Sequence, residues 1–100
     1  EADIETIPGY APFIADREMH ARLREVVEEL GITFIEEEYS AASSDMGDVS
    51  QAFPSIMLGL PGVNGLFHNP EFRVIDEKAA YLLPSVVLAR YLEKLVGPAD

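Results

Sequence analysis

The sequence predicts an α/β domain with two main helices and about three short strands. Residues 17–30 and the stretch after Asp76 repeat apolar side chains at helical spacing. Residues 32–36 and 54–60 are β-branched, aromatic or continuously apolar runs of the kind found in strands. The chain has 100 residues, of which 48% are hydrophobic and 25% charged, so we expect one domain with an apolar core.

For the first third of the chain the sequence predicts a strand, a break and a helix, in that order. Residues 1–7 mix β-branched residues with acids, which predicts a short strand with one exposed face. Two prolines and a glycine within residues 8–12 prevent helix and ladder from continuing, so this segment is a candidate hinge. Asp16 can cap a helix over residues 17–30, and Gly31 is a natural stop for it.

The middle of the chain has two predicted strands separated by a long polar segment. Residues 32–36 follow the glycine directly, as a strand does after a short turn. Residues 37–53 are acidic, small and polar without a stable period, and a loop of this length is usually functional or disordered. Residues 54–60 predict a strand covered on both faces, and turn signals over residues 61–65 end it.

The C-terminal helix is predicted from Asp76, which can cap it, to a stop at Gly97. Its apolar stripe is wide, so we expect the helix to pack on the sheet. Pro84 lies inside the helix, where it removes one backbone donor and crowds the preceding turn. A kink or restart near residue 83 is therefore expected.

Charge and composition exclude several classes of function. Eighteen acids and seven bases give a net charge of −11, which repels phosphate backbones and anionic lipids, so neither nucleic acid nor membrane is an expected partner. Without cysteine the chain has no disulfide, thiolate metal site or cysteine nucleophile. We find no signal-peptide pattern and no apolar stretch of about 18 residues, and take the cytoplasm as the default compartment.

The chain has two histidines, and histidine is a common metal ligand. His68 follows a predicted buried strand and precedes Asn69 and Pro70, whose rigid turn could aim the imidazole into a cleft. Position alone nevertheless favours an ordinary loop histidine. His20, on the first predicted helix, is interpreted as a solvated flank residue, and the acidic run at residues 36–38 as solvated surface.

The glycine-bearing segment at residues 43–50 contains two carboxylates three residues apart. Asp45 and Asp48 could approach one hard cation, but the spacing of an EF-hand is absent. The favoured interpretation is that Ser44, Asp45 and Asp48 accept hydrogen bonds from backbone amides and shape a loop. Gly47 would then supply a backbone conformation closed to other residues.

Three segments of the chain resemble one enzyme family. Residues 43–50 (Ser-Ser-Asp-Met-Gly-Asp-Val-Ser) and 67–72 (Phe-His-Asn-Pro-Glu-Phe), followed by an apolar helix, resemble the C-terminal part of the M20 metallopeptidases. The residues at 43–50 are similar to the corresponding stretch in the aminobenzoyl-glutamate hydrolases, one branch of that family. Residues 8–16 resemble the return from that family's inserted lid into its catalytic domain. This implies that residues 1–12 end a lid or dimerisation domain and its hinge, and that residues 13–100 are the C-terminal part of a three-layer α/β/α zinc-peptidase-type catalytic domain.

The resemblance also implies roles for particular residues. His68 would coordinate one ion of a centre of two divalent metal ions, zinc or manganese. The cleft would be lined by Ser44, Asp45, Gly47 and Asp48, and His68 would be supported by Asn69, Pro70 and Glu71. The family's other ligands and its general base lie in stretches that do not occur in this chain, so no catalytic residue is expected here.

The function implied for the intact protein is hydrolysis of an amide bond in a small acylated amino acid or dipeptide-like substrate, such as aminobenzoyl-glutamate. The isolated chain would be an inactive fragment that needs the remainder of the parent enzyme. The alternative is a stand-alone αβ binding or assembly module without catalysis. In that case unpaired strand edges would join a second copy in a homo-oligomer.

Overall fold

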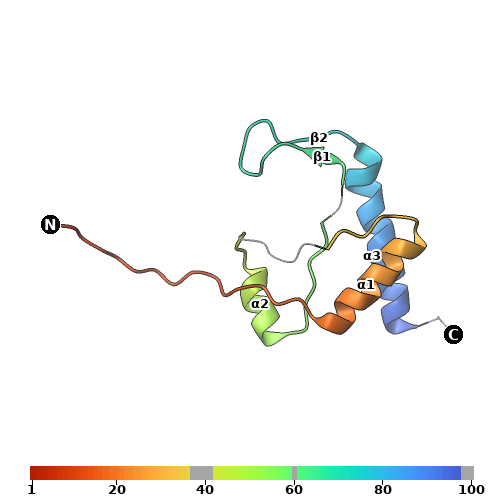
Figure 1. Cartoon of the computed structure of the whole chain (residues 1–100), viewed down its shortest axis with the longest axis horizontal. Helices are drawn as coiled ribbons and strands as arrows, with labels where there is room; N and C mark the ends of the chain where they lie inside the picture. Colours follow the sequence, from red (N-terminus) through yellow and green to blue (C-terminus); the bar gives the residue numbers. More distant parts are fainter. Residues whose placement is uncertain (37–41, 60, 98–100) are drawn as a thin grey trace.

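The computed structural model describes residues 1–36, 42–59 and 61–97 and shows a mixed fold of helices and a short two-stranded sheet. The elements are α1 (Arg17–Glu29), α2 (Met46–Ala52), β1 (Val63–Asn64), β2 (Arg73–Val74), a π-helical turn η1 (Lys78–Leu82) and α3 (Leu83–Val96). Figure 1 shows α1 beside α3, with the β1–β2 hairpin and α2 at other edges of the body.

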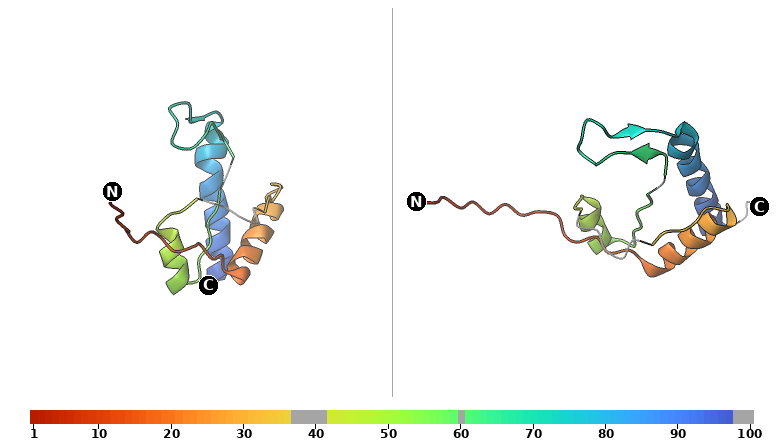
Figure 2. Two further views of the ribbon diagram at one scale, coloured as in Figure 1. Left: turned by 60° about the vertical axis from the view of Figure 1, so that its left-hand side comes forward. Right: turned by 45° about the horizontal axis from the view of Figure 1, so that its top comes forward.

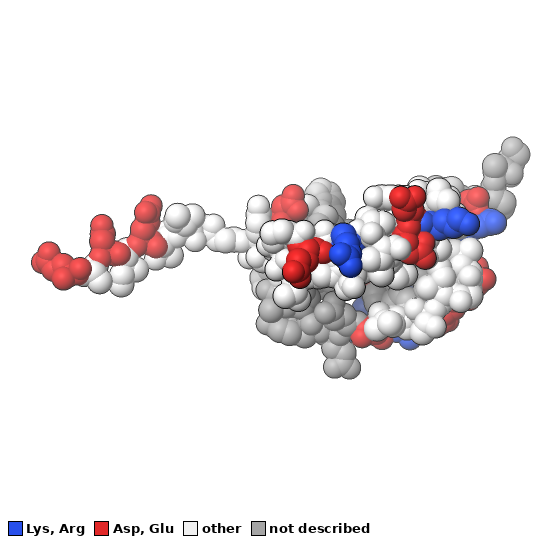
Figure 3. All heavy atoms as spheres, turned by 90° about the horizontal axis from the view of Figure 1, so that it is seen from above, with Lys and Arg blue, Asp and Glu red and all other residues white. Residues whose placement is uncertain are grey.

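Residues 1–10 form an arm that extends away from this body (Figure 1). All ten are exposed, and the chain as a whole measures 67 × 35 × 23 Å. Glu1, Asp3 and Glu5 place acidic groups along the arm, as Figure 3 shows. The predicted strand at residues 1–7 does not form, because none of the described segments pairs with the arm to take up its backbone hydrogen bonds.

The helix predicted over residues 17–30 is confirmed as α1. The Asp16 carboxylate accepts a hydrogen bond from the Met19 amide at 2.9 Å, which satisfies one of the free donors of the first turn. The helix ends at Glu29, and Gly31 follows in the left-handed region at φ 73°.

The predicted restart in the C-terminal helix is also confirmed. The Asp76 carboxylate accepts from the Ala79 amide at 3.1 Å, and a π-helical turn precedes α3. The Leu83 amide donates to the Lys78 carbonyl, five residues back, and regular α-helix follows with Pro84 in its first turn. Proline is tolerated there because a first-turn amide has no partner within the helix.

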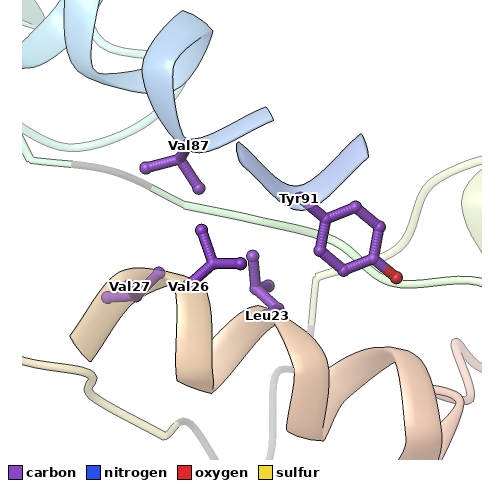
Figure 4. Close-up of a cluster of buried hydrophobic side chains, with 5 residues drawn as sticks. All are labelled: Leu23, Val26, Val27, Val87 and Tyr91. Carbon is purple, nitrogen blue, oxygen red and sulfur yellow. The ribbon is translucent and has the colours of Figure 1, made fainter. Parts of the chain in front are cut away.

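The core lies between α1 and α3. Leu23, Val26 and Val27 of α1 meet Val87 and Tyr91 of α3, and all five side chains are at most 5% exposed (Figure 4). Half-buried residues pack around them, among them Ile32, Phe34, Ile56 and Leu58. Burial of one apolar stripe from each helix is therefore the main source of stability in this half of the molecule.

The predicted strands at residues 32–36 and 54–60 are not formed in the described residues, where only β1 and β2 pair. Residue 60 lies outside that description. Ile56 and Leu58 are half-buried whereas Met57 between them is 55% exposed, which is the alternation of a strand with one covered face. The side chains thus have strand periodicity, but no neighbouring strand completes a ladder.

One strand of the sheet, β1, forms where turn signals were expected, and β2 forms where no strand was predicted. Val63 pairs with Val74 and Asn64 with Arg73 in an antiparallel hairpin. The hairpin connects directly to η1, since the Gly62 carbonyl accepts from the Ile75 amide at 2.8 Å and from the Asp76 amide at 3.2 Å.

The polar segment predicted as a loop over residues 37–53 contains the helix α2 instead, while residues 37–41 lie outside the described structure. The helix lacks an apolar period because its one buried residue is Gly47. Its contacts are made by short polar side chains, which a search for apolar spacing does not detect.

Candidate functional site

His68 lies in the loop of the β1–β2 hairpin, at residues 65–72, which projects from the body (Figure 2). The two sides of the loop are close, because a Cβ on Gly65 would lie 2.8 Å from the Cα of Phe72. The rings of Phe67 and Phe72 lie 5.2 Å apart across it. Backbone contact at its base and aromatic contact further along therefore hold the loop.

The backbone around His68 is shaped by Asn69. The Asn69 side-chain oxygen accepts from the Glu71 amide at 2.9 Å, and its carbonyl accepts from the Phe72 amide at 3.0 Å. His68 itself has φ 60°, in the left-handed region, and is exposed, as are Asn69, Pro70 and Glu71. Asn69 thus fixes the turn that presents the imidazole to solvent.

The loop carries two side chains that can bind a metal ion, the imidazole of His68 and the carboxylate of Glu71. Neutral imidazole suits zinc and other divalent transition metals, but a catalytic zinc needs about three protein ligands. Among the described residues, no group of three histidine or acidic side chains is placed to hold an ion. Within the described residues, His68 is therefore not part of a complete metal site.

Of the residues predicted to line a cleft, Ser44 and Asp48 accept hydrogen bonds from backbone amides. Asp48 accepts a hydrogen bond from the Ala11 amide at 2.8 Å, as expected of a carboxylate that binds a backbone amide. Ser44 accepts from the Met46 amide at 3.3 Å, whereas the Asp45 side chain makes no cap hydrogen bond. In the described residues no hydrogen bond joins α2 to the His68 loop.

The reason given for Gly47 is wrong. Gly47 lies in α2 and is not among the residues with positive φ, so it supplies no special backbone conformation. Instead, a Cβ at this position would lie 1.8 Å from the Ala11 carbonyl oxygen. Glycine is required because another segment of backbone lies directly against it.

Sequence reasoning missed two partners of the same contact. The Ser50 hydroxyl accepts from the Ile14 amide at 3.0 Å and donates to the Gly47 carbonyl at 2.7 Å. The Gln51 side chain donates to the Pro12 carbonyl at 2.8 Å. The separation of 36 to 39 residues between these partners explains why no local pattern indicated them.

His20 is not the solvated flank residue that was expected. Its ring meets the Phe34 ring edge to face at 5.3 Å, and its Nε2 lies 3.9 Å from the Glu36 carboxylate. Arg24 donates to the same carboxylate at 2.6 Å and lies over the Phe34 ring. Glu36 is therefore an ion-pair partner as well as a surface residue, while residues 37 and 38 lie outside the described structure.

An apolar groove runs beside the core, with a volume of about 580 Å³. The residues that line it come from α1, the segment at 56–61, β1, η1 and α3: Met19, Leu23, Ile56, Leu58, Pro61, Val63, Ala80, Pro84, Leu88, Tyr91, Leu92 and Leu95. None carries a charge. The groove can accept apolar surface, and the one hydroxyl among its lining side chains is that of Tyr91.

Comparison with known proteins does not identify the chain, since no family model, curated protein or solved structure matches it. Among the helices of the described residues, none is both long and apolar enough to cross a bilayer.

Proposed function

We propose that this chain is the C-terminal part of an M20-type metal-dependent amidohydrolase, in which His68 supplies one metal ligand. The observation that carries the proposal is the placement of His68: an exposed imidazole on a projecting loop whose turn is fixed by the neighbouring Asn69. An imidazole exposed in this way can bind a metal ion whose other ligands come from another part of a larger protein.

The apolar surface of α3 supports a larger parent domain. Leu88, Leu92 and Leu95 are each about half exposed although they line the groove. Val86 is also half exposed and is not among the residues packed against the core. A helix that is apolar on several faces is usually covered on several faces, as in the middle of a layered α/β domain.

In the proposed enzyme, two divalent ions would polarise the amide carbonyl of an acylated amino acid and lower the pKa of a bound water. The role proposed for this chain is to supply one metal ligand. His68 offers a ring nitrogen, and Asn69 holds the turn that directs it. The proton shuttle and the remaining ligands belong to residues outside this chain.

The proposal is tested with aminobenzoyl-glutamate as substrate and zinc or manganese added. In the longer protein that contains this sequence, we expect hydrolysis that falls at least about 100-fold in His68→Ala, because a direct ligand should matter no less than residues that only support ligands. His20→Ala is the matched control, and its activity should stay close to that of the unchanged protein. Equal rates for His68→Ala and the unchanged protein would contradict the proposal.

The groove favours a second candidate, an assembly module without catalysis. Its uncharged lining and the half-exposed leucines of α3 would be covered in an oligomer. Mass in solution at several concentrations, together with amide protection, separates the two. A well-protected dimer that persists on dilution favours the module, while a loosely protected or aggregating chain favours a part of a larger enzyme.

A further inference from the structure

The base of the β1–β2 hairpin loop holds two groups that can react with each other, the side-chain amide of Asn64 and the main-chain nitrogen of Gly65. Asn64 is the last residue of β1 and is exposed. Its Oδ1 accepts a hydrogen bond from the Gly65 amide at 2.8 Å, so the carbon that carries this oxygen lies next to that nitrogen. Glycine has no side chain to shield the nitrogen.

The reaction between these groups is a deamidation. Hydroxide removes the proton of the Gly65 amide, and the nitrogen attacks Cγ of Asn64. The new bond closes a five-membered succinimide ring, while the bond from Cγ to Nδ2 breaks and Nδ2 leaves as ammonia with a proton taken from water. Water then opens the ring. Cleavage of the new bond gives aspartate, whereas cleavage of the original peptide bond gives isoaspartate, in which the main chain continues through Cγ.

The other asparagine of the chain, Asn69, is not placed for this reaction. It is followed by Pro70, whose nitrogen carries no proton to lose. Its Oδ1 accepts instead from the amide of Glu71, two residues further along, at 2.9 Å. The two asparagines lie five positions apart in the same hairpin, so Asn69 is an internal control for Asn64.

Ring closure requires the backbone at Asn64 to turn, and the hairpin is small enough to permit this. Each of its strands has two residues, and all four are exposed. Isolated two-stranded hairpins are marginally stable in water, and exposed segments with few buried contacts open at little cost in free energy. The hairpin can therefore open locally while the apolar core between α1 and α3 stays folded.

We propose that Asn64 is a site of spontaneous deamidation, and that the product formed determines whether the His68 loop keeps its shape. Asn64 lies opposite Arg73 in the hairpin, so aspartate would place a carboxylate across from a guanidinium and stabilise the pair. Isoaspartate adds one carbon to the main chain of β1, and the pairing of Val63 with Val74 is then lost. This inference goes beyond the proposed function, because it holds whether or not the chain binds metal.

The test follows both asparagines by mass spectrometry of peptides while the folded chain is kept in mildly alkaline buffer, with a parallel sample unfolded in urea. We expect Asn64 to convert in the folded chain, with release of ammonia and a rate that rises in proportion to hydroxide, while Asn69 keeps its amide. Three results would overturn the proposal: Asn64 stable when folded but reactive in urea, Asn64 stable in both samples, or equal conversion of Asn69.

The effect on the loop is tested by NMR of the Val63–Val74 contact. Asn64→Asp represents the aspartate product, and the isoaspartate form is isolated from the converted protein. We expect the contact to be kept in Asn64→Asp, to weaken when Arg73→Gln is added, and to be lost in the isoaspartate form. Asn64→Ser, which has no amide to lose, should keep the contact throughout the incubation. An isoaspartate form that retains the contact would overturn the predicted effect on the loop.

Discussion

The two segments that carry the resemblance to M20 enzymes have opposite properties in the structure. In residues 43–50, Gly47, Asp48 and Ser50 are engaged with the backbone of residues 11–14. In residues 67–72, the turn is equally well defined, yet it leaves the His68 ring exposed. The polar groups of residues 43–50 therefore form hydrogen bonds within the protein, whereas residues 67–72 leave the His68 imidazole accessible to solvent.

This difference teaches how similar-looking motifs can serve different purposes. A short polar segment with a glycine suggests a site when it is seen alone, because glycine, serine and aspartate are common in binding loops. Whether the polar atoms are available depends on what else lies against them. In α2 the glycine makes room for a carbonyl, and nearby polar side chains bind the amides and carbonyl of the same segment.

The largest effect that would sharpen this comparison is expected from Gly47→Ala. The added methyl must displace the Ala11 carbonyl, and such overpacking typically costs about 1–3 kcal/mol. Alanine is the better helix former by about 1 kcal/mol, which offsets part of that cost. We expect a net loss of up to about 2 kcal/mol in urea unfolding, with release of the Ala11 and Ile14 amides. A stabilised Gly47→Ala protein would show that the backbone of residues 11–14 does not rest on α2.

A smaller loss is expected from Ser50→Ala. The variant removes the acceptor for the Ile14 amide and the donor to the Gly47 carbonyl, and a hydrogen bond of this kind contributes about 1 kcal/mol. Ser43→Ala, at an exposed position before the helix, is the control and should change the urea midpoint little. Equal shifts in the two variants would mean that the Ser50 hydroxyl does not stabilise the contact between α2 and residues 11–14.

The His68 loop is tested by comparing His68→Gly with His68→Ala. At φ 60° an alanine pays the steric cost of the left-handed region and a glycine does not, although glycine loses more conformational entropy on folding. We expect the glycine variant to populate the hairpin more, by a free-energy difference of up to about 1 kcal/mol, measured from the Val63–Val74 contact by NMR. A more populated hairpin in the alanine variant would exclude the left-handed turn.

The smallest effect concerns the pH dependence of the α1–α3 contact. A hydrogen bond to the Glu29 carboxylate is the main reason that the pKa of Lys94 is raised above its usual value of 10.5, and the charge of Glu25 adds to it. Because the folded-state pKa is the higher one, the stabilisation is complete below the usual pKa and is lost as pH rises through the folded value. The difference in urea midpoint between the unchanged protein and Lys94→Met should therefore shrink above about pH 10.5. A difference that grows with pH would contradict this assignment.

Helix α1 and the C-terminal helix could be predicted from the sequence because their determinants are local, whereas α2 could not. Asp16 and Asp76 cap the helices as expected, and apolar spacing identified the face of α1 that carries Leu23, Val26 and Val27. The predictions of strands were wrong for a physical reason. Side-chain alternation is a property of one segment, whereas a ladder needs a second segment, and none pairs with residues 32–36 or 54–59 in the described chain.

In the candidate site, too, the features with local determinants could be predicted and those that depend on distant segments could not. His68 and the turn at Asn69 are adjacent in sequence, so a rigid turn could be expected there. The contacts of α2 with residues 11–14 join positions more than 35 residues apart, and no pattern within either segment indicates the other. The packing of Phe34 against His20 was missed for a related reason, since it depends on how the chain returns along α1 after Gly31.

The measurement that tests the central claim most directly is a zinc titration of this chain, followed by calorimetry and by the NMR signals of both histidine rings. As one ligand of an incomplete centre, His68 should bind zinc weakly, with a Kd above about 1 μM, equivalent to roughly −8 kcal/mol, and its ring signals should shift before those of His20. His68→Ala should lose this binding, and His20→Ala should keep it. Binding that persists in His68→Ala, or shifts at His20 first, would contradict the account.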